Sequence, residues 1–110
     1  MQQASGLDTA FAALSDPTRR AILARLAQGA ATVNELAAPF ALSQPTISKH
    51  LKVLENAGLI ETGRDAQRRP RRLRPQAIQQ VAEWAEPFRL LWEKRLDNFE
   101  AHLATMHEEK

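Results

Sequence analysis

SQPTISKHLKVLENAGLIE, residues 43–61, is the stretch that decides the fold, because it predicts a helix followed by a strand. Ser43 is a residue type that caps helix N-termini, and Ile47, Leu51 and Leu54 then recur at the spacing of one helix face. Gly58 is expected to end this helix, and the residues after it predict a strand over 59–62. The polar residues between the apolar ones form the opposite face, which is expected to point outward.

A shorter helix is predicted immediately before this stretch. Thr32 and Glu35 have the spacing of a capping box, which places a helix from about Val33 to Ala38. Only a turn over residues 39–42 separates the two helices. Two short helices joined by so brief a turn form a helix-turn-helix unit, here over about 33–57, whose second helix can enter the major groove of DNA.

A two-stranded β-hairpin, or wing, is predicted over about 59–74, with a tip at 63–70 and a return strand at 71–74. Pro70 cannot donate to a strand ladder, so the wing is expected to be shorter or more mobile than usual. The wing carries six arginines against the single acid Asp65: Arg64, Arg68, Arg69, Arg71, Arg72 and Arg74. Such a cluster repels itself without a counter-anion, and arginine binds phosphates or enters the minor groove. Nucleic acid is the expected anion; a solubilising loop or an acidic-membrane patch is the alternative.

Two helices are predicted before the helix-turn-helix unit, and one long helical region after the wing. The first two run over about 7–14 and from Pro17 to about 28, with Asp16 as a capping residue. The last runs over about 76–107, where Pro87 is expected to kink or split it. Its aromatic-rich stripe is too large for one thin monomer to cover, so the sequence predicts a homodimer whose interface includes Leu7, Phe11, Trp84, Phe88, Trp92, Phe99 and Leu103. Packing of the stripe against the first helix is the alternative, and both can hold together.

Composition agrees with a single domain over 1–110 of the mainly α class. Residues 1–74 carry 11 Lys and Arg against 6 Asp and Glu, a balance of +5, whereas residues 75–110 carry 4 against 7, a balance of −3. A polyanionic partner would therefore meet the first two thirds of the chain. The absence of cysteine excludes disulfides and thiolate metal sites. The chain shows no signal-peptide pattern and no membrane span, so a cytoplasmic location without membrane contact is expected.

The candidate DNA-binding residues lie on the polar face of the 43–61 helix and on the wing. Gln, Ser and Thr side chains can hydrogen-bond base edges, whereas Lys and Arg mainly meet phosphates. Taken alone, the polar helix face could simply be solvated. The arginine-rich wing is the observation that favours DNA as the partner. The full set is Ser43, Gln44, Thr46, Ser48, Lys49, His50, Lys52, Arg64, Arg68, Arg69, Arg71 and Arg72.

Four segments together resemble the ArsR/SmtB family of winged-helix repressors: DPTRRAILARL at 16–26, TVNELA at 32–37, SQPTISKHLKVLENAGLI at 43–60, and the arginine-rich wing. The resemblance extends over about residues 7–103. It implies dimeric repression at a promoter, often the regulator's own, with double-stranded DNA of pseudo-palindromic sequence as partner. It also implies that Gln44, Thr46, Ser48 and His50 face the groove, while Lys49 and Lys52 lie near the backbone.

The chain departs from the many family members that sense metals. It has no cysteine, and near its end Glu100, His102, His107, Glu108 and Glu109 lack the paired spacing of terminal-helix sensors. The sequence therefore predicts no metal, no other cofactor and a place in a branch without metal-binding cysteines, whose inducing signal the residues do not reveal. No nucleophile has an identifiable base beside it, so no catalytic residue and no enzyme activity are expected. The alternatives are a protein-interaction adaptor on the same scaffold and a metal-responsive repressor.

Overall fold

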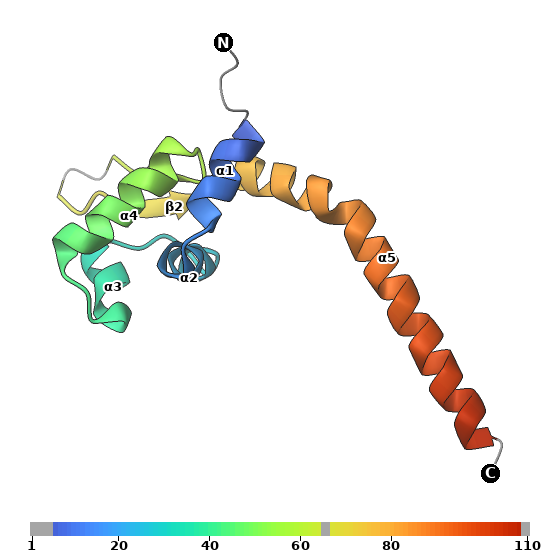
Figure 1. Cartoon of the computed structure of the whole chain (residues 1–110). Helices are drawn as coiled ribbons and strands as arrows, with labels where there is room; N and C mark the ends of the chain where they lie inside the picture. The colour runs from blue at the N-terminus through green and yellow to red at the C-terminus, as the bar shows by residue number, and fades with distance from the viewer. Residues whose placement is uncertain (1–5, 65–66, 109–110) are drawn as a thin grey trace.

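The computed structural model describes residues 6–64 and 67–108 and shows a helical body from which one long helix extends (Figure 1). The principal axes measure 67 × 41 × 21 Å, because the long helix reaches far beyond the body. The elements are, in chain order, α1 (Gly6–Leu14), α2 (Pro17–Leu26), α3 (Val33–Ala37), the 3₁₀ turn η1 (Ala38–Phe40), α4 (Gln44–Asn56), β1 (Ile60–Thr62), β2 (Arg71–Leu73) and α5 (Pro75–Glu108). The predicted class, a mainly α winged helix-turn-helix, is confirmed.

Helices α2, α3 and α4 begin at the capping residues that the sequence predicts. The Asp16 carboxylate accepts the Arg19 backbone N–H at 3.0 Å, and the Ser43 hydroxyl accepts that of Thr46 at 3.3 Å. Thr32 and Glu35 form the complete capping box of α3. These side chains satisfy backbone donors that have no partner within the helix, which explains why each helix starts where it does.

The core lies between α1, α2, α3, α4 and the start of the wing. The predicted apolar face of α4 is confirmed, since Ile47 and Leu54 are fully buried and Leu51 is nearly so. The long helix α5 adds only residues from its first two turns, Ala77, Ile78 and Val81, which are partly buried against this core. The other buried residues are Ala10, Ala13, Ile22, Leu23, Leu26, Ala31, Leu36, Ala37, Ala57, Leu59 and Ile60.

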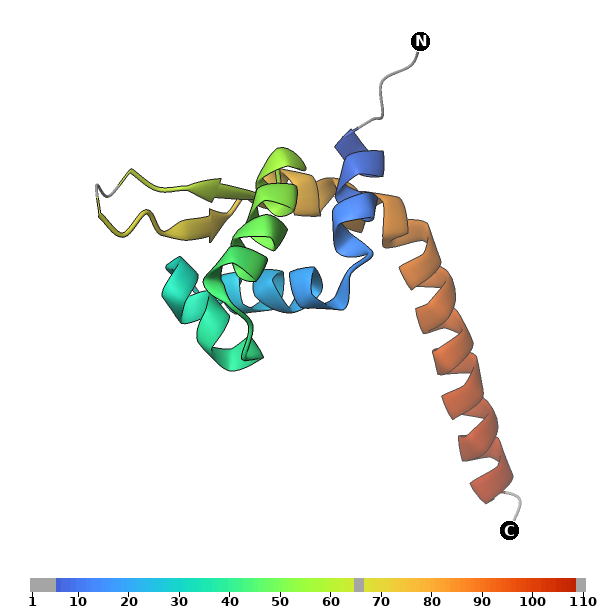
Figure 2. The same cartoon turned by 60° about the vertical axis from the view of Figure 1, so that its left-hand side comes forward.

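The wing is an antiparallel pair that projects from the side of the body away from the far end of α5 (Figure 2). Glu61 lies opposite Arg72 and Thr62 opposite Arg71, and each strand is one residue shorter than predicted. A bridge between Ala31 and Arg71 gives β2 a partner on its other edge. Pro70 precedes β2 and uses its carbonyl oxygen to accept the Gly63 N–H at 2.6 Å, so its missing N–H costs the ladder nothing. Asp65 lies outside the described residues.

The last helix is continuous through Pro87, so the predicted split does not occur. Its axis does change direction within its N-terminal half, the half that contains this proline (Figure 1). The same half packs against α1, where the rings of Phe11 and Trp84 meet edge to face with centroids 5.2 Å apart. Beyond that contact α5 leaves the body. Within the described residues, no helix combines the length and the apolar character needed to cross a bilayer.

Candidate nucleic-acid interface

The outer face of α4 presents polar side chains that have no structural task within the described part of the chain. Ser48, Lys49 and Lys52 are exposed, and their side chains make no hydrogen bond or ion pair with another described residue. They follow one another along the face opposite the buried Ile47 and Leu51. This face can therefore meet an external partner without breaking an internal interaction.

Three other residues of the predicted set already have partners at the start of α4. The hydroxyls of Ser43 and Thr46 lie 2.9 Å apart, and Ser43 also caps the helix. The side-chain amide of Gln44 donates to the side-chain oxygen of Asn34 in α3. Gln44 is still exposed, and this bond leaves its own carbonyl oxygen free to accept. The role of Asn34 was not predicted, because the two residues meet only when the helix-turn-helix unit folds.

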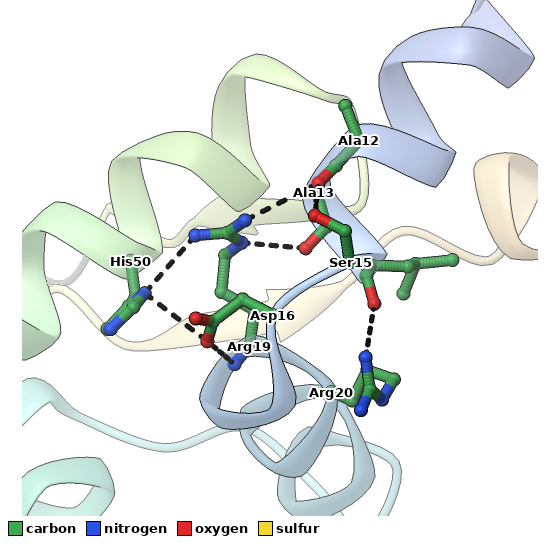
Figure 3. A network of polar contacts seen from close by, with 8 residues as sticks. Ala12, Ala13, Ser15, Asp16, Arg19, Arg20 and His50 are labelled. Atoms are coloured by element: carbon green, nitrogen blue, oxygen red, sulfur yellow. Dashed lines mark hydrogen bonds and ion pairs between the residues drawn. The ribbon is translucent and has the colours of Figure 1, made fainter.

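His50 is not placed as the sequence predicts. Its side chain is only 19% exposed, and the ring points from α4 towards the N-terminus of α2 (Figure 3). Nδ1 lies 3.4 Å from a guanidinium nitrogen of Arg19 and 3.9 Å from a carboxylate oxygen of Asp16. This corrects the expectation that the ring stands free on the polar face.

The wing arginines differ in how exposed their side chains are. Arg64, Arg68 and Arg69 are exposed, as is Arg72, whose Nε lies 3.9 Å from a carboxylate oxygen of Glu61. Arg71 is partly buried, and one of its terminal nitrogens donates to the carbonyl of Arg69 at 2.6 Å. The outward arginines are placed to meet phosphate, whereas Arg71 first shapes the base of the hairpin.

Two clefts lie beside the wing and join the two predicted parts of the interface: the larger lies between α3, the start of α4 and the wing, and the smaller between α4 and the wing. The larger, about 450 Å³, is lined by Thr32, Val33, Asn34, Glu35, Gln44, Gln67, Arg68, Arg69 and Arg71. The smaller, about 170 Å³, is lined by Ser48, Leu51, Lys52, Glu55, Thr62, Arg69 and Arg71. The structure thus brings Gln44 and Ser48 beside arginines that are distant in the sequence.

Glu35 is the acid that lines the larger cleft, and it is committed to internal partners. The backbone N–H of Thr32, and then its hydroxyl, donate to this carboxylate and hold its pKa below the ordinary value, with a smaller contribution from Arg25. Arg25 lies 3.8 Å away. Glu35 is ionised, but it already bonds Thr32 and lies beside Arg25. The arginine charges are therefore the ones in this cleft that an external partner can meet.

A second exposed surface runs along α5 and contains most of the predicted interface residues. Trp84 is 52% exposed, Phe88 59%, Trp92 67%, Phe99 58% and Leu103 39%. Leu90, Leu91 and Leu96 are also exposed and were missed. Leu96 could have been found, since it follows Trp92 by four residues and precedes Phe99 by three.

A metal site has no support in the geometry of the described residues. Within 6–64 and 67–108, no three His, Asp or Glu residues lie together in a way that could hold an ion. Glu109 and the side chains of His107 and Glu108 lie outside the described part.

Comparison with known proteins adds evidence of another kind. The family described as a helix-turn-helix domain matches residues 14–63. The HTH-type transcriptional regulator Rv2034 of Mycobacterium tuberculosis is 53% identical over 53 residues, which are 48% of this chain and 50% of that protein. The transcriptional repressor SdpR of Bacillus subtilis is 43% identical over 61 residues, which are 56% of this chain and 68% of that protein. The match therefore spans about half the length of the first relative.

Two solved structures resemble most of the chain. The crystal structure of an ArsR family transcriptional regulator is 40% identical, with a TM-score of 0.71 over 81% of this chain and 98% of that one. A solution structure from Mycobacterium bovis, described as a homodimeric winged helix-turn-helix DNA-binding domain of a possible ArsR-family regulator, is 25% identical. Its TM-score is 0.61 over 86% of this chain and 92% of that one.

Proposed function

Because this chain belongs to the ArsR family of winged helix-turn-helix transcriptional regulators, we propose that it binds double-stranded DNA as a homodimer and represses its own or a neighbouring promoter. The observation that carries the proposal is the larger cleft, where Gln44 of α4 lies with wing arginines. An amide can recognise a base edge while guanidinium groups neutralise the adjacent phosphates.

The DNA-binding residues divide by role. Gln44, Thr46 and Ser48 would read bases in the major groove, while Lys49, Lys52 and the exposed wing arginines would contact the backbone. Ser43 caps the helix and would present its N-terminus to phosphate. We assign His50 to internal positioning instead of direct contact, because its ring is turned inward, whereas Arg71, which lines both clefts, would contact the backbone with the other wing arginines.

Dimerisation through α5 would bury the exposed aromatic stripe. A monomer leaves Trp92 and Phe99 more than half exposed, which is costly for large apolar side chains. The structure from Mycobacterium bovis is homodimeric, which supports a homodimer of this chain. Two recognition helices would then enter successive major-groove faces, about 34 Å apart, of a pseudo-palindromic operator in the cytoplasm.

The test is binding of the purified chain to its upstream DNA and to a scrambled duplex across a salt series, with mass determined in parallel. Selective binding by a dimer is the expected result. Arg68→Ala and Arg72→Ala are each expected to weaken binding to both duplexes and to reduce the salt slope by about 0.9 if the arginine neutralises one phosphate. Lys94→Ala, which removes an exposed cation from α5, is the matched control and is expected to leave the slope unchanged.

Weak, salt-sensitive binding to both duplexes alike would contradict the proposal and favour an adaptor that uses the same scaffold for protein contacts. Zinc titration during the same assay distinguishes a metal-responsive repressor from one that does not respond to metal. A change in operator affinity on adding zinc would support that alternative.

A further inference from the structure

A network of polar contacts outside the DNA-facing surface joins α1, α2 and α4 (Figure 3). At its centre is Arg19 in the first turn of α2. Its Nε donates to the carbonyl of Ala13 at 2.6 Å and its Nη2 to that of Ala12 at 3.4 Å. Its Nη1 lies 3.4 Å from Nδ1 of His50, which belongs to the recognition helix α4. One planar guanidinium therefore contacts both the end of α1 and α4.

The end of α1 explains why a cation is placed there. The last turn of α1 contains no basic residue, and its final carbonyls have no partner within the helix. Ser15 donates to the carbonyl of Ala12 through its hydroxyl at 2.7 Å, and two arginines of α2 supply further donors: Arg19 as above, and Arg20, whose Nη1 donates to the carbonyl of Leu14 at 2.8 Å. Only Arg19 continues to α4, so capping of α1 does not account for its second contact.

His50 receives that contact under a chemical constraint. Arginine can only donate, so the contact requires a His50 Nδ1 that carries no proton. The other charged group facing the ring is Asp16, whose carboxylate lies 3.9 Å from the same nitrogen. The ring thus faces, through one nitrogen, both the carboxylate that caps α2 and the guanidinium that caps α1, and its side chain is only 19% exposed.

The opposite end of the network reaches the surface proposed for dimerisation. Phe11 directly precedes Ala12 in α1, and its ring meets Trp84 of α5 at 5.2 Å. Trp84 in turn lies 5.0 Å from Phe88. Ala13, whose carbonyl Arg19 binds, is 1% exposed. A chain of direct contacts therefore runs from the aromatic stripe through α1 and Arg19 to the middle of α4.

We infer that Arg19 is a positioning residue of the recognition helix, which acts through His50 to hold α4 at a set orientation relative to the α1–α5 pair. The inference rests on the proposed function, because the orientation matters when two copies join through these helices. In such a dimer the contact sets the separation of the two recognition helices, and hence the half-site spacing that the protein accepts.

Arg19→Gln and Arg20→Gln form a matched pair that tests the inference. Each removes one charge and hydrogen bonds to the end of α1, two for Arg19 and one for Arg20, but only the first removes the contact with α4. Operator affinity of Arg19→Gln is expected to fall about tenfold below that of Arg20→Gln, while affinity for scrambled duplex is equal in the two. On operators lengthened by one base pair between half-sites, wild type and Arg20→Gln are expected to lose affinity steeply, and Arg19→Gln much less.

Two changes at His50 provide a second test that leaves the cap of α1 intact. His50→Asn keeps an acceptor close to the position of Nδ1, whereas His50→Leu keeps the bulk and removes the acceptor. His50→Asn is expected to retain the spacing preference of the wild type, and His50→Leu to lose it as Arg19→Gln does. Circular dichroism would show whether Arg19→Gln folds. If it does not, the two His50 variants still test whether the contact between Arg19 and His50 sets the spacing preference.

Equal spacing profiles for Arg19→Gln and Arg20→Gln, or a wild-type profile for His50→Leu, would overturn the inference. Loss of base preference in both His50 variants would overturn it too, since it would mean that the ring itself contacts DNA. A wild-type protein that does not distinguish operator from scrambled duplex would overturn the proposed function, and the inference with it.

Discussion

Gln44 and His50 lie six residues apart on the same helix, and the sequence predicts the same outward role for both. The structure separates them. Gln44 stays exposed with an amide held by Asn34, whereas His50 turns towards Arg19 and Asp16. A residue type predicts which bonds a side chain can make, but its neighbours in space decide which of those bonds form.

Gln44→Ala is expected to reduce discrimination between operator and scrambled duplex by about 1–3 kcal/mol, because one amide contact with a base edge is lost. Competition binding measured by fluorescence anisotropy would show it. Asn34→Ala is the control, since it releases the Gln44 amide without removing it and is expected to have a smaller effect. Equal losses on operator and random DNA would argue that Gln44 contacts only the backbone.

Asp16→Ala is expected to lower the melting temperature at pH 7, and this difference is expected to shrink in acid. The backbone N–H of Arg19 donates to the carboxylate and, with the Arg19 charge, holds the pKa of Asp16 below its ordinary value of 3.8. A carboxylate whose pKa is lowered by folding stabilises the folded state at pH values above its ordinary pKa. This stabilisation is lost as the pH falls through the pKa of the folded state.

Asp16→Asn provides the control, because it keeps a capping acceptor without a titrating charge. Thermal melts of the three proteins at pH 7 and pH 2.5 give the comparison. An Asp16→Ala deficit of the same size at both pH values would show that the carboxylate charge contributes nothing to stability.

At the scale of elements, local signals predicted most helix and strand boundaries. Capping residues and Gly58 delimit α4, and Gly58 adopts the left-handed φ of 74° expected after a helix. The turn between α3 and α4 was less predictable. It contains the 3₁₀ turn η1 and a left-handed Ala41 with a φ of 53°, a conformation that alanine adopts at a cost. The packing of α3 against α4 imposes this conformation.

Ala41→Gly is therefore expected to raise the free energy of unfolding by up to about 1 kcal/mol, because glycine adopts positive φ without a steric penalty. Ala38→Gly is the matched control, since Ala38 has right-handed helical angles and glycine there is expected to cost about 0.5–1 kcal/mol. Urea denaturation measures both. Destabilisation by both changes alike would show that the turn stores no strain at Ala41.

At the scale of the whole molecule, the chain divides into a basic body and an acidic, apolar-striped helix. The wing and the far end of α5 lie on opposite sides of the body (Figure 2). On α5, Arg89 makes ion pairs of 2.5 Å with Glu86 and with Glu93. These three charged residues bond to one another, while the aromatic stripe stays exposed.

Trp92→Ala is expected to weaken the proposed dimer by about 2 kcal/mol or more, because large aromatic side chains dominate interface energies. Sedimentation at a series of low protein concentrations would detect the monomers. Lys94→Ala alters an exposed residue of the same helix and is expected to leave the mass unchanged. An unchanged mass for Trp92→Ala would place the interface elsewhere.

The sequence by itself determined the helices, their caps, the hairpin and the division of charge, because each depends on residues within a turn or two of one another. Thr32 and Glu35 cap α3 without help from the rest of the chain. Only the tertiary structure decided which polar side chains remain free. Arg19 and His50 are 31 positions apart, and no local pattern signals that they meet. Their contact exists because core packing brings the ends of α1 and α2 against the middle of α4.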